Sequence, residues 1–247
     1  MTVVTRGKAF GKLLEGIIFD WSGTISDDLI AVHRAATIVG KTFGLVVDPD
    51  PFAWASRGPH TPVTDIEKRA AQAARDGDTE LAQRLQAVGV TAYIEAYTNA
   101  LRVVVHPATD RAVGHCAPVA INGVPAAIRA LGTTGKYKLG VVSAAPKDLL
   151  DEEILAYGLG ETFDDVIGEC YEKHVGLAWM CEHWGISPSR VAYVGDTRGD
   201  MKAAKMAGAM YAVGVKCGYD GKLVAQADPD RLYENVCDFL LDIASGR

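Results

Sequence analysis

The stretch Gly16–Thr24, GIIFDWSGT, decides the fold. It opens with an apolar run, and a short apolar run closed by a turn signal is typical of a strand buried on both faces. Asp20 comes directly after this run, and Gly23 permits a tight turn behind it. We therefore predict a strand over Gly16–Trp21 that ends in Asp20. A carboxylate at a strand end is able to attack phosphorus, although an aspartate in this position also commonly caps a turn.

The second half of the chain repeats the same pattern. Short apolar strands are predicted over Leu139–Val142, Asp165–Ile167, Val191–Val194 and Tyr211–Val215, and helical segments separate them. Strands that alternate with helices indicate a parallel sheet, so we predict an α/β fold with a Rossmann-like core. In such sheets the chemistry lies beyond the carboxyl ends of the strands. Asp20, Ser143 and Asp196 each follow a predicted strand, which suggests one shared site.

A helical insertion separates the first strand from the others. Apolar residues recur at spacings of three and four over Ala31–Gly44, Thr64–Ala74 and Thr79–Arg102, which predicts helices. The four prolines of Asp48–Pro62 predict a structured loop. We therefore expect a catalytic core formed by residues 1–27 and 117–247, and a helical cap domain formed by residues 28–116.

The composition limits the classes of function. The 247 residues carry 25 basic and 31 acidic side chains, a net charge of −6, which argues against broad binding of nucleic acid. A bound metal still permits an anionic substrate. We find no signal peptide and no apolar run long enough to span a membrane, and the five cysteines form no CxxC pair. We expect a cytoplasmic monomer or homodimer with reduced cysteines.

Three further elements offer chemistry, and each also has a plainer interpretation. The Ser143 hydroxyl is able to bind a phosphoryl oxygen, although taken alone it favours a helix N-cap. The Lys173 ammonium suits developing negative charge or an exposed surface. Asp196 and Asp200, four residues apart after a strand, suit a hard cation with oxygen ligands. Asp200 also suits an ordinary helix N-terminus.

In this order, FDWSGT, VVS, an isolated lysine and VGDTRGDMKAAKMAG resemble the haloacid dehalogenase superfamily. The resemblance spans about Glu15–Trp21 and Gly123–Asp242, and it implies a Rossmann-like core with an inserted cap. It implies Asp20 as nucleophile, Ser143 as phosphoryl ligand and Lys173 as charge stabiliser. It implies Asp20, Asp196 and the Ser22 backbone carbonyl as Mg²⁺ ligands, with Asp200 as support for the metal. The candidate substrate contacts are Thr24, Ala144, Arg57 and His60. It implies a magnesium-dependent phosphatase that acts on a small phosphorylated metabolite through an aspartyl-phosphate intermediate.

The sequence departs from the usual phosphatase pattern at Ser22. Most phosphatases of the superfamily carry a second aspartate there, which protonates the leaving oxygen, and a serine hydroxyl is a poor general acid. The branches that lack that aspartate include the 2-haloacid dehalogenases and the phosphonoacetaldehyde hydrolases. The dehalogenases do not need magnesium, so the retained Asp196 and Asp200 disfavour that branch.

Cleavage of a C–P bond stays open as an alternative. FDWSGT resembles the phosphonoacetaldehyde hydrolases, whose substrate is a phosphonate, but those enzymes form a Schiff base with a cap lysine. This chain has no lysine between Lys41 and Lys68. Lys173 is followed by His174, where the superfamily commonly has proline. A non-catalytic binding protein that lost its acid at Ser22 is the third hypothesis.

Overall fold

The computed structural model describes residues 14–55, 62–106, 116–208 and 211–245. Its internal contacts divide the chain into two compact units. Unit 1 comprises Met1–Asp27 and Val119–Arg247, and unit 2 comprises Asp28–Pro118. The chain therefore leaves unit 1 after Asp27 and returns to it at Val119.

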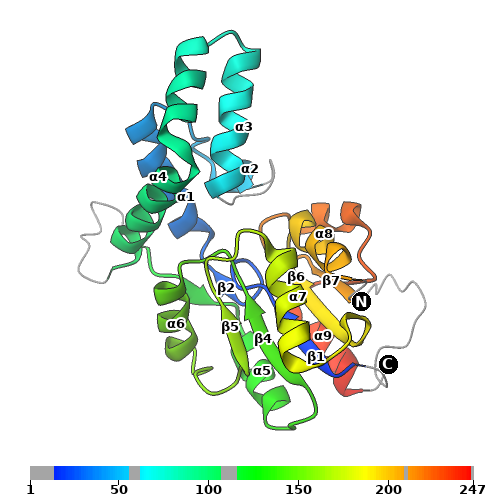
Figure 1. The fold of residues 1–247 in the computed structure, drawn as a ribbon. Helices are drawn as coiled ribbons and strands as arrows, with labels where there is room; N and C mark the ends of the chain where they lie inside the picture. The colour runs from blue at the N-terminus through cyan, green and yellow to red at the C-terminus, as the bar shows by residue number, and fades with distance from the viewer. Residues whose placement is uncertain (1–13, 56–61, 107–115, 209–210, 246–247) are drawn as a thin grey trace. The chain divides into compact units, whose positions relative to one another are not determined.

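Unit 1 is built on a six-stranded sheet with the order β5-β4-β1-β6-β7-β8 (Figure 1). Every strand pairs in parallel with its neighbours. The strands are β1 (Gly16–Phe19), β4 (Lys138–Val142), β5 (Asp165–Ile167), β6 (Val191–Gly195), β7 (Tyr211–Val215) and β8 (Arg231–Tyr233). The predicted α/β fold with a parallel sheet is confirmed.

The register of the central strands brings their carboxyl ends together. Phe19 of β1 lies opposite Val141 of β4 on one side and opposite Val194 of β6 on the other. After β1 the chain adds strands on one side of it, and then returns to add β6, β7 and β8 on the other. Such a reversal of strand order opens a crevice at the carboxyl ends, where open α/β sheets bind ligands.

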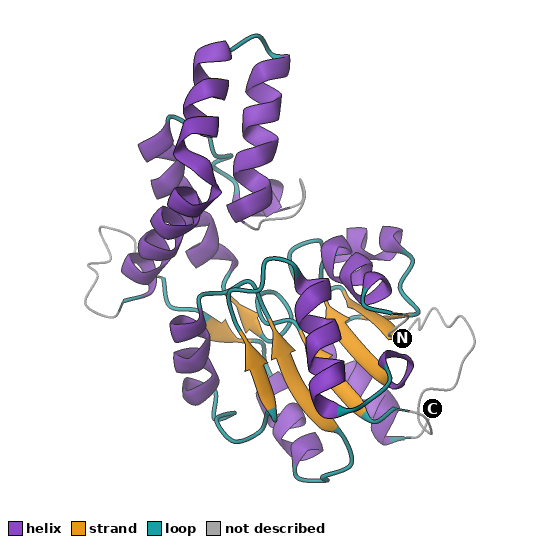
Figure 2. Cartoon of the chain, viewed as in Figure 1, coloured by secondary structure: helices purple, strands orange, loops and turns teal. Residues whose placement is uncertain are grey.

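Helices cover both faces of this sheet (Figure 2). They are α5 (Val124–Gly132), α6 (Lys147–Ala156), α7 (Lys173–Trp184), α8 (Arg198–Met206) and α9 (Val236–Ala244). Successive side chains of β1 point to opposite faces, so Ile17 and Phe19 pack in one core with α5, α6 and α9, whereas Ile18 packs in the other with α7 and α8. All three are fully buried, and each such burial contributes roughly 1.5–3 kcal/mol. The double burial of β1 explains its unbroken apolar sequence.

Smaller elements complete unit 1. A two-stranded antiparallel sheet joins β2 (Ser26–Asp27) to β3 (Val119–Ala120), the segments where the chain leaves and re-enters the unit. Two 3-10 helices, η1 (Pro188–Arg190) and η2 (Gly221–Ala227), lie before β6 and after β7.

Unit 2 is helical. It contains α1 (Leu29–Phe43), α2 (Pro51–Ala55), α3 (Pro62–Arg75) and α4 (Thr79–Val105), and α4 packs against both α1 and α3. The Asp78 carboxylate caps α4 by accepting from the Leu81 amide at 3.0 Å, and Gly89 interrupts the helix with a φ of 70°. The prediction that residues 48–62 form only a loop was wrong, because α2 lies within them.

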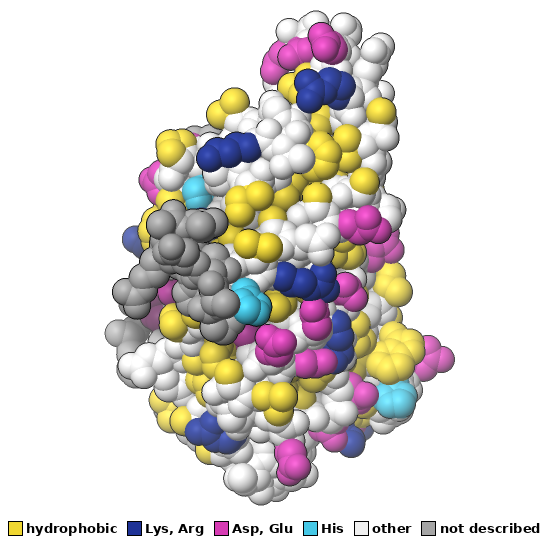
Figure 3. Space-filling view, turned by 90° about the vertical axis from the view of Figure 1, so that its left-hand side faces the viewer, with side chains coloured by type: hydrophobic (Ala, Val, Ile, Leu, Met, Phe, Trp, Pro, Cys, Tyr) yellow, Lys and Arg dark blue, Asp and Glu magenta, His cyan; other side chains and the backbone are white. Residues whose placement is uncertain are grey.

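Two further properties of the described residues concern membrane-spanning helices and charged or apolar surface patches. Among them, no helix combines the length and the apolar character that crossing a bilayer requires. On the face that Figure 3 displays, their acidic, basic and hydrophobic side chains are interspersed.

Candidate active site

The turn after β1 is shaped by its own backbone. The Trp21 carbonyl accepts hydrogen bonds from the amides of Thr24, Ile25 and Ser26 at 2.8–3.1 Å, so the chain folds back on itself at once. Gly23 lies inside this turn with a φ of +76°, and a Cβ there would approach Asp196 Oδ2 to 2.5 Å. Glycine is required at this position both for its conformation and for the space beside the carboxylate.

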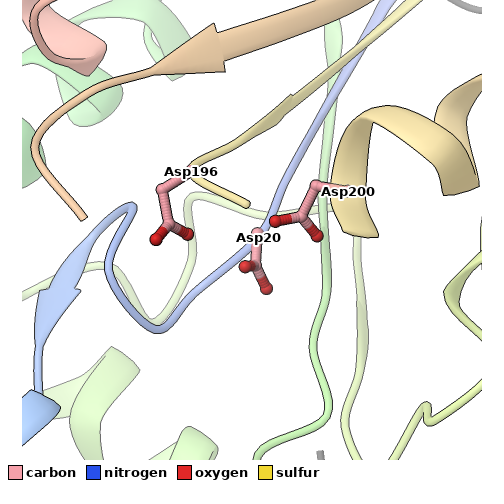
Figure 4. Close-up of side chains that lie close together, drawn as sticks. All are labelled: Asp20, Asp196 and Asp200. Carbon is pink, nitrogen blue, oxygen red and sulfur yellow. The ribbon is translucent and has the colours of Figure 1, made fainter. Parts of the chain in front are cut away.

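Three carboxylates meet beside this turn (Figure 4). Asp20 follows β1, Asp196 follows β6, and Asp200 lies in the first turn of α8. Each offers an oxygen atom, and these atoms lie within 4.8 Å of one another. All three side chains are buried. Several carboxylates in a buried site repel one another unless positive charge compensates them.

Lys173 provides part of that charge. It is the first residue of α7, and its Nζ lies 2.7 Å from Asp20 Oδ1 and 2.7 Å from Asp200 Oδ1. Burial would lower the pKa of Lys173, but the two carboxylates outweigh burial and raise the pKa above its ordinary value. Lys173 therefore stays an ammonium. The interpretation of Lys173 as a surface lysine does not hold, since its side chain is only 16% exposed.

The three carboxylates differ in how far nearby positive charge and hydrogen bonds offset the effect of burial on their pKa values. Burial and the Asp200 charge raise the pKa of Asp20 to about 7, against the opposing effect of Lys173. Burial, followed by the charges of Asp200 and Asp20, raises the pKa of Asp196 well above its usual value. Burial acts on Asp200 as well, but Lys173 and Thr197 hold the pKa of that carboxyl below its usual value. With all three carboxyls ionised, the site would hold more negative charge than Lys173 balances.

Asp200 is fixed by its surroundings. It accepts hydrogen bonds from the Thr197 amide at 3.0 Å and hydroxyl at 2.5 Å, and from the Tyr193 hydroxyl at 3.1 Å. Thr197 and Asp200 form a reciprocal capping box at the start of α8. The helix-terminus interpretation of Asp200 is thus correct, and it holds together with the contact to Lys173.

Asp196 is held by Thr24 and by the loop after β7, which the sequence analysis did not single out. Its Oδ1 accepts from the Thr24 hydroxyl at 3.1 Å, and its Oδ2 accepts from the Tyr219 backbone amide at 2.5 Å. Gly218 packs so closely that a Cβ there would overlap the Asp196 carboxylate. The loop KCGYDG follows β7 at the same edge of the sheet, and this placement is the signal that could have identified it.

The remaining predicted residues fall into three groups. Ser143 is buried after β4, and its Oγ accepts from the Ala145 amide at 3.1 Å. The N-cap interpretation of Ser143 was wrong, because α6 begins only at Lys147 and its N-cap is Pro146. Ser22 and Ala144 are half-buried, in the turn after β1 and beside Ser143. Arg57 and His60 lie outside the described residues.

A sequence model of the haloacid dehalogenase-like hydrolases matches residues 14–208. The chain belongs to this family. It is therefore a hydrolase with the Rossmann-like core that the motifs implied, and its four motif segments, from FDWSGT to the last aspartate, all fall within the matched range.

Relatives of this haloacid dehalogenase-like hydrolase include enzymes named phosphoglycolate phosphatase. The one from Shigella dysenteriae is 25% identical over 92% of this chain and 91% of its own length. The one from Vibrio cholerae is 25% identical over 91% of this chain and 95% of its own length. A third, from Vibrio vulnificus, is 29% identical, but the match covers only 43% of this chain and 49% of the relative.

Solved structures share the fold of this hydrolase at lower identity. A predicted phosphatase from Clostridium acetobutylicum has a TM-score of 0.71 at 16% identity, covering 95% of this chain and 100% of that one. A predicted phosphoglycolate phosphatase from Haemophilus somnus has a TM-score of 0.69 at 19% identity, covering 93% of this chain and 98% of that one.

Proposed function

We propose that this hydrolase is a magnesium-dependent phosphatase that acts on a small phosphorylated metabolite, with Asp20 as its nucleophile. The observation that carries the proposal is the buried cluster in which Asp20 contacts Lys173 and lies beside Asp196 and Asp200. The relatives named phosphatase support the same chemistry.

Two displacements at phosphorus make up the proposed reaction. An Asp20 carboxylate oxygen bonds to phosphorus while the bond to the leaving oxygen breaks, which forms an aspartyl phosphate. A water molecule then attacks that phosphorus, releasing phosphate and restoring the carboxylate. Lys173 would stabilise negative charge on the phosphoryl oxygens, and Ser143 would donate its hydroxyl to one of them. Thr24 and Ala144 would contact the substrate in the same crevice.

The donor set fits Mg²⁺. It consists of carboxylate oxygens, which hard divalent cations prefer, and burial raises the pKa of both Asp20 and Asp196, as expected where a cation is needed to balance the charge. Asp20, Asp196 and the Ser22 backbone carbonyl would hold the ion, and Asp200 would support it. When bound, it would supply positive charge next to the phosphoryl oxygens.

The direct test is turnover of an aryl phosphate with and without EDTA. We expect hydrolysis in Mg²⁺, a fall of at least about tenfold in EDTA, and recovery when Mg²⁺ is added back. Full activity in excess EDTA would contradict the metal assignment. Failure to hydrolyse any aryl, acyl or alkyl phosphate would instead favour a non-catalytic binding protein.

The C–P alternative predicts a different covalent intermediate. Phosphonoacetaldehyde hydrolases join their aldehyde substrate to a cap lysine, and this chain lacks a lysine between Lys41 and Lys68. We therefore expect no Schiff base when the protein is incubated with phosphonoacetaldehyde and borohydride. Intact-mass and peptide mass spectrometry check this. A borohydride-dependent mass gain on a lysine of residues 28–118 would make C–P cleavage the better assignment.

We also propose that unit 2 serves as the cap of this hydrolase. The proposal rests on the place of the insertion, directly after the strand that carries the nucleophile, and on its helical content. Arg57 and His60 remain its candidate substrate contacts.

A further inference from the structure

One half-buried carboxylate of unit 1 has no part in the proposed reaction. Glu153 lies on α6, and its Oε2 accepts three hydrogen bonds: from Trp21 Nε1 at 2.8 Å, from Ser26 Oγ at 2.7 Å and from the Tyr157 hydroxyl at 3.3 Å. The Trp21 ring is fully buried and stacks on Tyr157, with centroids 5.7 Å apart and an interplanar angle of 10°. A carboxylate with three donors on one oxygen holds all three groups in place.

These contacts act on the turn that carries the reacting groups. Trp21 separates Asp20 from Ser22 in the chain, and its carbonyl accepts the three amide hydrogen bonds that define the turn. Ser26 closes the turn, since its carbonyl accepts from the Gly23 amide at 2.7 Å. Glu153 therefore holds the turn by a side chain at each end.

The turn also contacts Asp196, the carboxylate that follows β6. Thr24 lies between the two residues that Glu153 holds, and its hydroxyl donates to Asp196. Asp20, on the residue before Trp21, contacts Lys173. A shift of the Trp21 side chain would thus move the nucleophile and Thr24 together, and displacement of reacting groups by about 1 Å can cost on the order of 10²-fold in rate.

We propose that Glu153 is a positioning residue of this active site, which sets the nucleophile turn through Trp21 and Ser26. The kinetic part of this proposal rests on the proposed phosphatase function. The hydrogen bonds described for Glu153 go to Trp21, Ser26 and Tyr157. Its effect on the nucleophile is therefore transmitted by the turn.

The first experiment compares Glu153→Ala with Glu153→Gln. The alanine variant removes the acceptor, whereas glutamine keeps one amide oxygen that is able to replace Oε2. For aryl phosphate in Mg²⁺ we expect Glu153→Ala to lower kcat by roughly 10–100-fold with KM changed by no more than about twofold. Glu153→Gln should recover most of the loss. The matched control is Glu152→Ala, an exposed carboxylate on the same helix, which should leave both constants unchanged.

A second variant tests the route through the turn. Trp21→Phe removes the Nε1 donor and keeps an aromatic ring beside Tyr157, so we expect a loss of kcat similar to that of Glu153→Ala. Combining the two substitutions should add little further loss, because both break the same contact. If Glu153→Ala does not fold, Trp21→Phe and Glu153→Gln still decide the question. Unchanged kcat in folded Glu153→Ala or Trp21→Phe would overturn the proposal.

Hydrogen exchange separates this proposal from the proposed function. In Glu153→Ala the amides of Thr24, Ile25 and Ser26 should exchange faster, with no such change in Glu152→Ala. This readout does not require turnover. An inactive wild-type protein would contradict the phosphatase assignment alone, whereas unchanged exchange of the turn would contradict the role of Glu153 alone.

Discussion

Replacing Asp20 with asparagine is expected to lower kcat for aryl phosphates by roughly 10³-fold or more. Asparagine has nearly the same shape, but its amide oxygen does not form the acyl phosphate. Steady-state kinetics in saturating Mg²⁺ measure the loss. A control is Asp27→Asn, an exposed aspartate at the end of β2, which should keep near-normal activity.

The same substitution should not unfold the protein. Burial and Asp200 raise the pKa of Asp20 to about 7, above its unfolded value, so its ionisation costs stability as pH rises from about 4 through 7. Without metal at pH 8, Asp20→Asn should therefore melt no lower than the wild type. Melting curves in EDTA check this, and circular dichroism confirms the fold. A folded Asp20→Asn protein with near-normal turnover would rule out Asp20 as the nucleophile.

The strands of the site could be predicted because each has a short, unmistakable pattern. β1, β4 and β6 are apolar runs followed at once by Asp20, Ser143 and Asp196. In a parallel sheet those ends share one edge, so the sequence was enough to place the three residues together. The role of Lys173 as charge stabiliser was implied by the resemblance to a family, since an isolated lysine carries no pattern of its own, and its contact with Asp20 was not predicted.

Other elements were missed for identifiable physical reasons. Proline was taken to indicate a loop over residues 48–62, but Pro51 begins α2, where a missing amide hydrogen costs nothing. The last helix, α9, was not predicted, although Val236, Phe239 and Ile243 repeat at helical spacing behind the Asn235 cap.

Local sequence patterns could not predict the contacts made by Glu153 and Tyr219. Glu153 lies 132 residues from Trp21 in the chain, and the Tyr219 amide lies 23 residues from Asp196. Each contact depends on how α6 or the loop after β7 packs on the sheet. Periodicity predicts that an element exists, but such packing brings specific side chains and amides together only in the folded chain.

We expect Ser22 to restrict the leaving groups that this hydrolase accepts. A serine hydroxyl does not protonate a departing alkoxide, and general acid catalysis is typically worth about 10²–10⁴-fold. Aryl phosphates, acyl phosphates and phosphoanhydrides need little such help. Phosphoglycolate, the substrate in the names of the relatives, is an alkyl ester and needs it. We therefore expect the rate across substituted phenyl phosphates to fall steeply as the pKa of the leaving group rises, and phosphoglycolate to be hydrolysed poorly.

Restoring a carboxylic acid should reverse this preference. In Ser22→Asp the new side chain would lie near Asp20, Asp196 and Asp200, and their charges would raise its pKa, which keeps it protonated and able to donate. We expect a flatter dependence on the leaving group and alkyl ester hydrolysis improved by about 10²-fold. Ser22→Asn is the matched control, because it has the size of aspartate without the acidic proton, and its slope should stay steep. A flat slope in the unmodified protein would show that another residue supplies the proton, and improvement in Ser22→Asn equal to that in Ser22→Asp would show that size rather than acidity limits the alkyl esters.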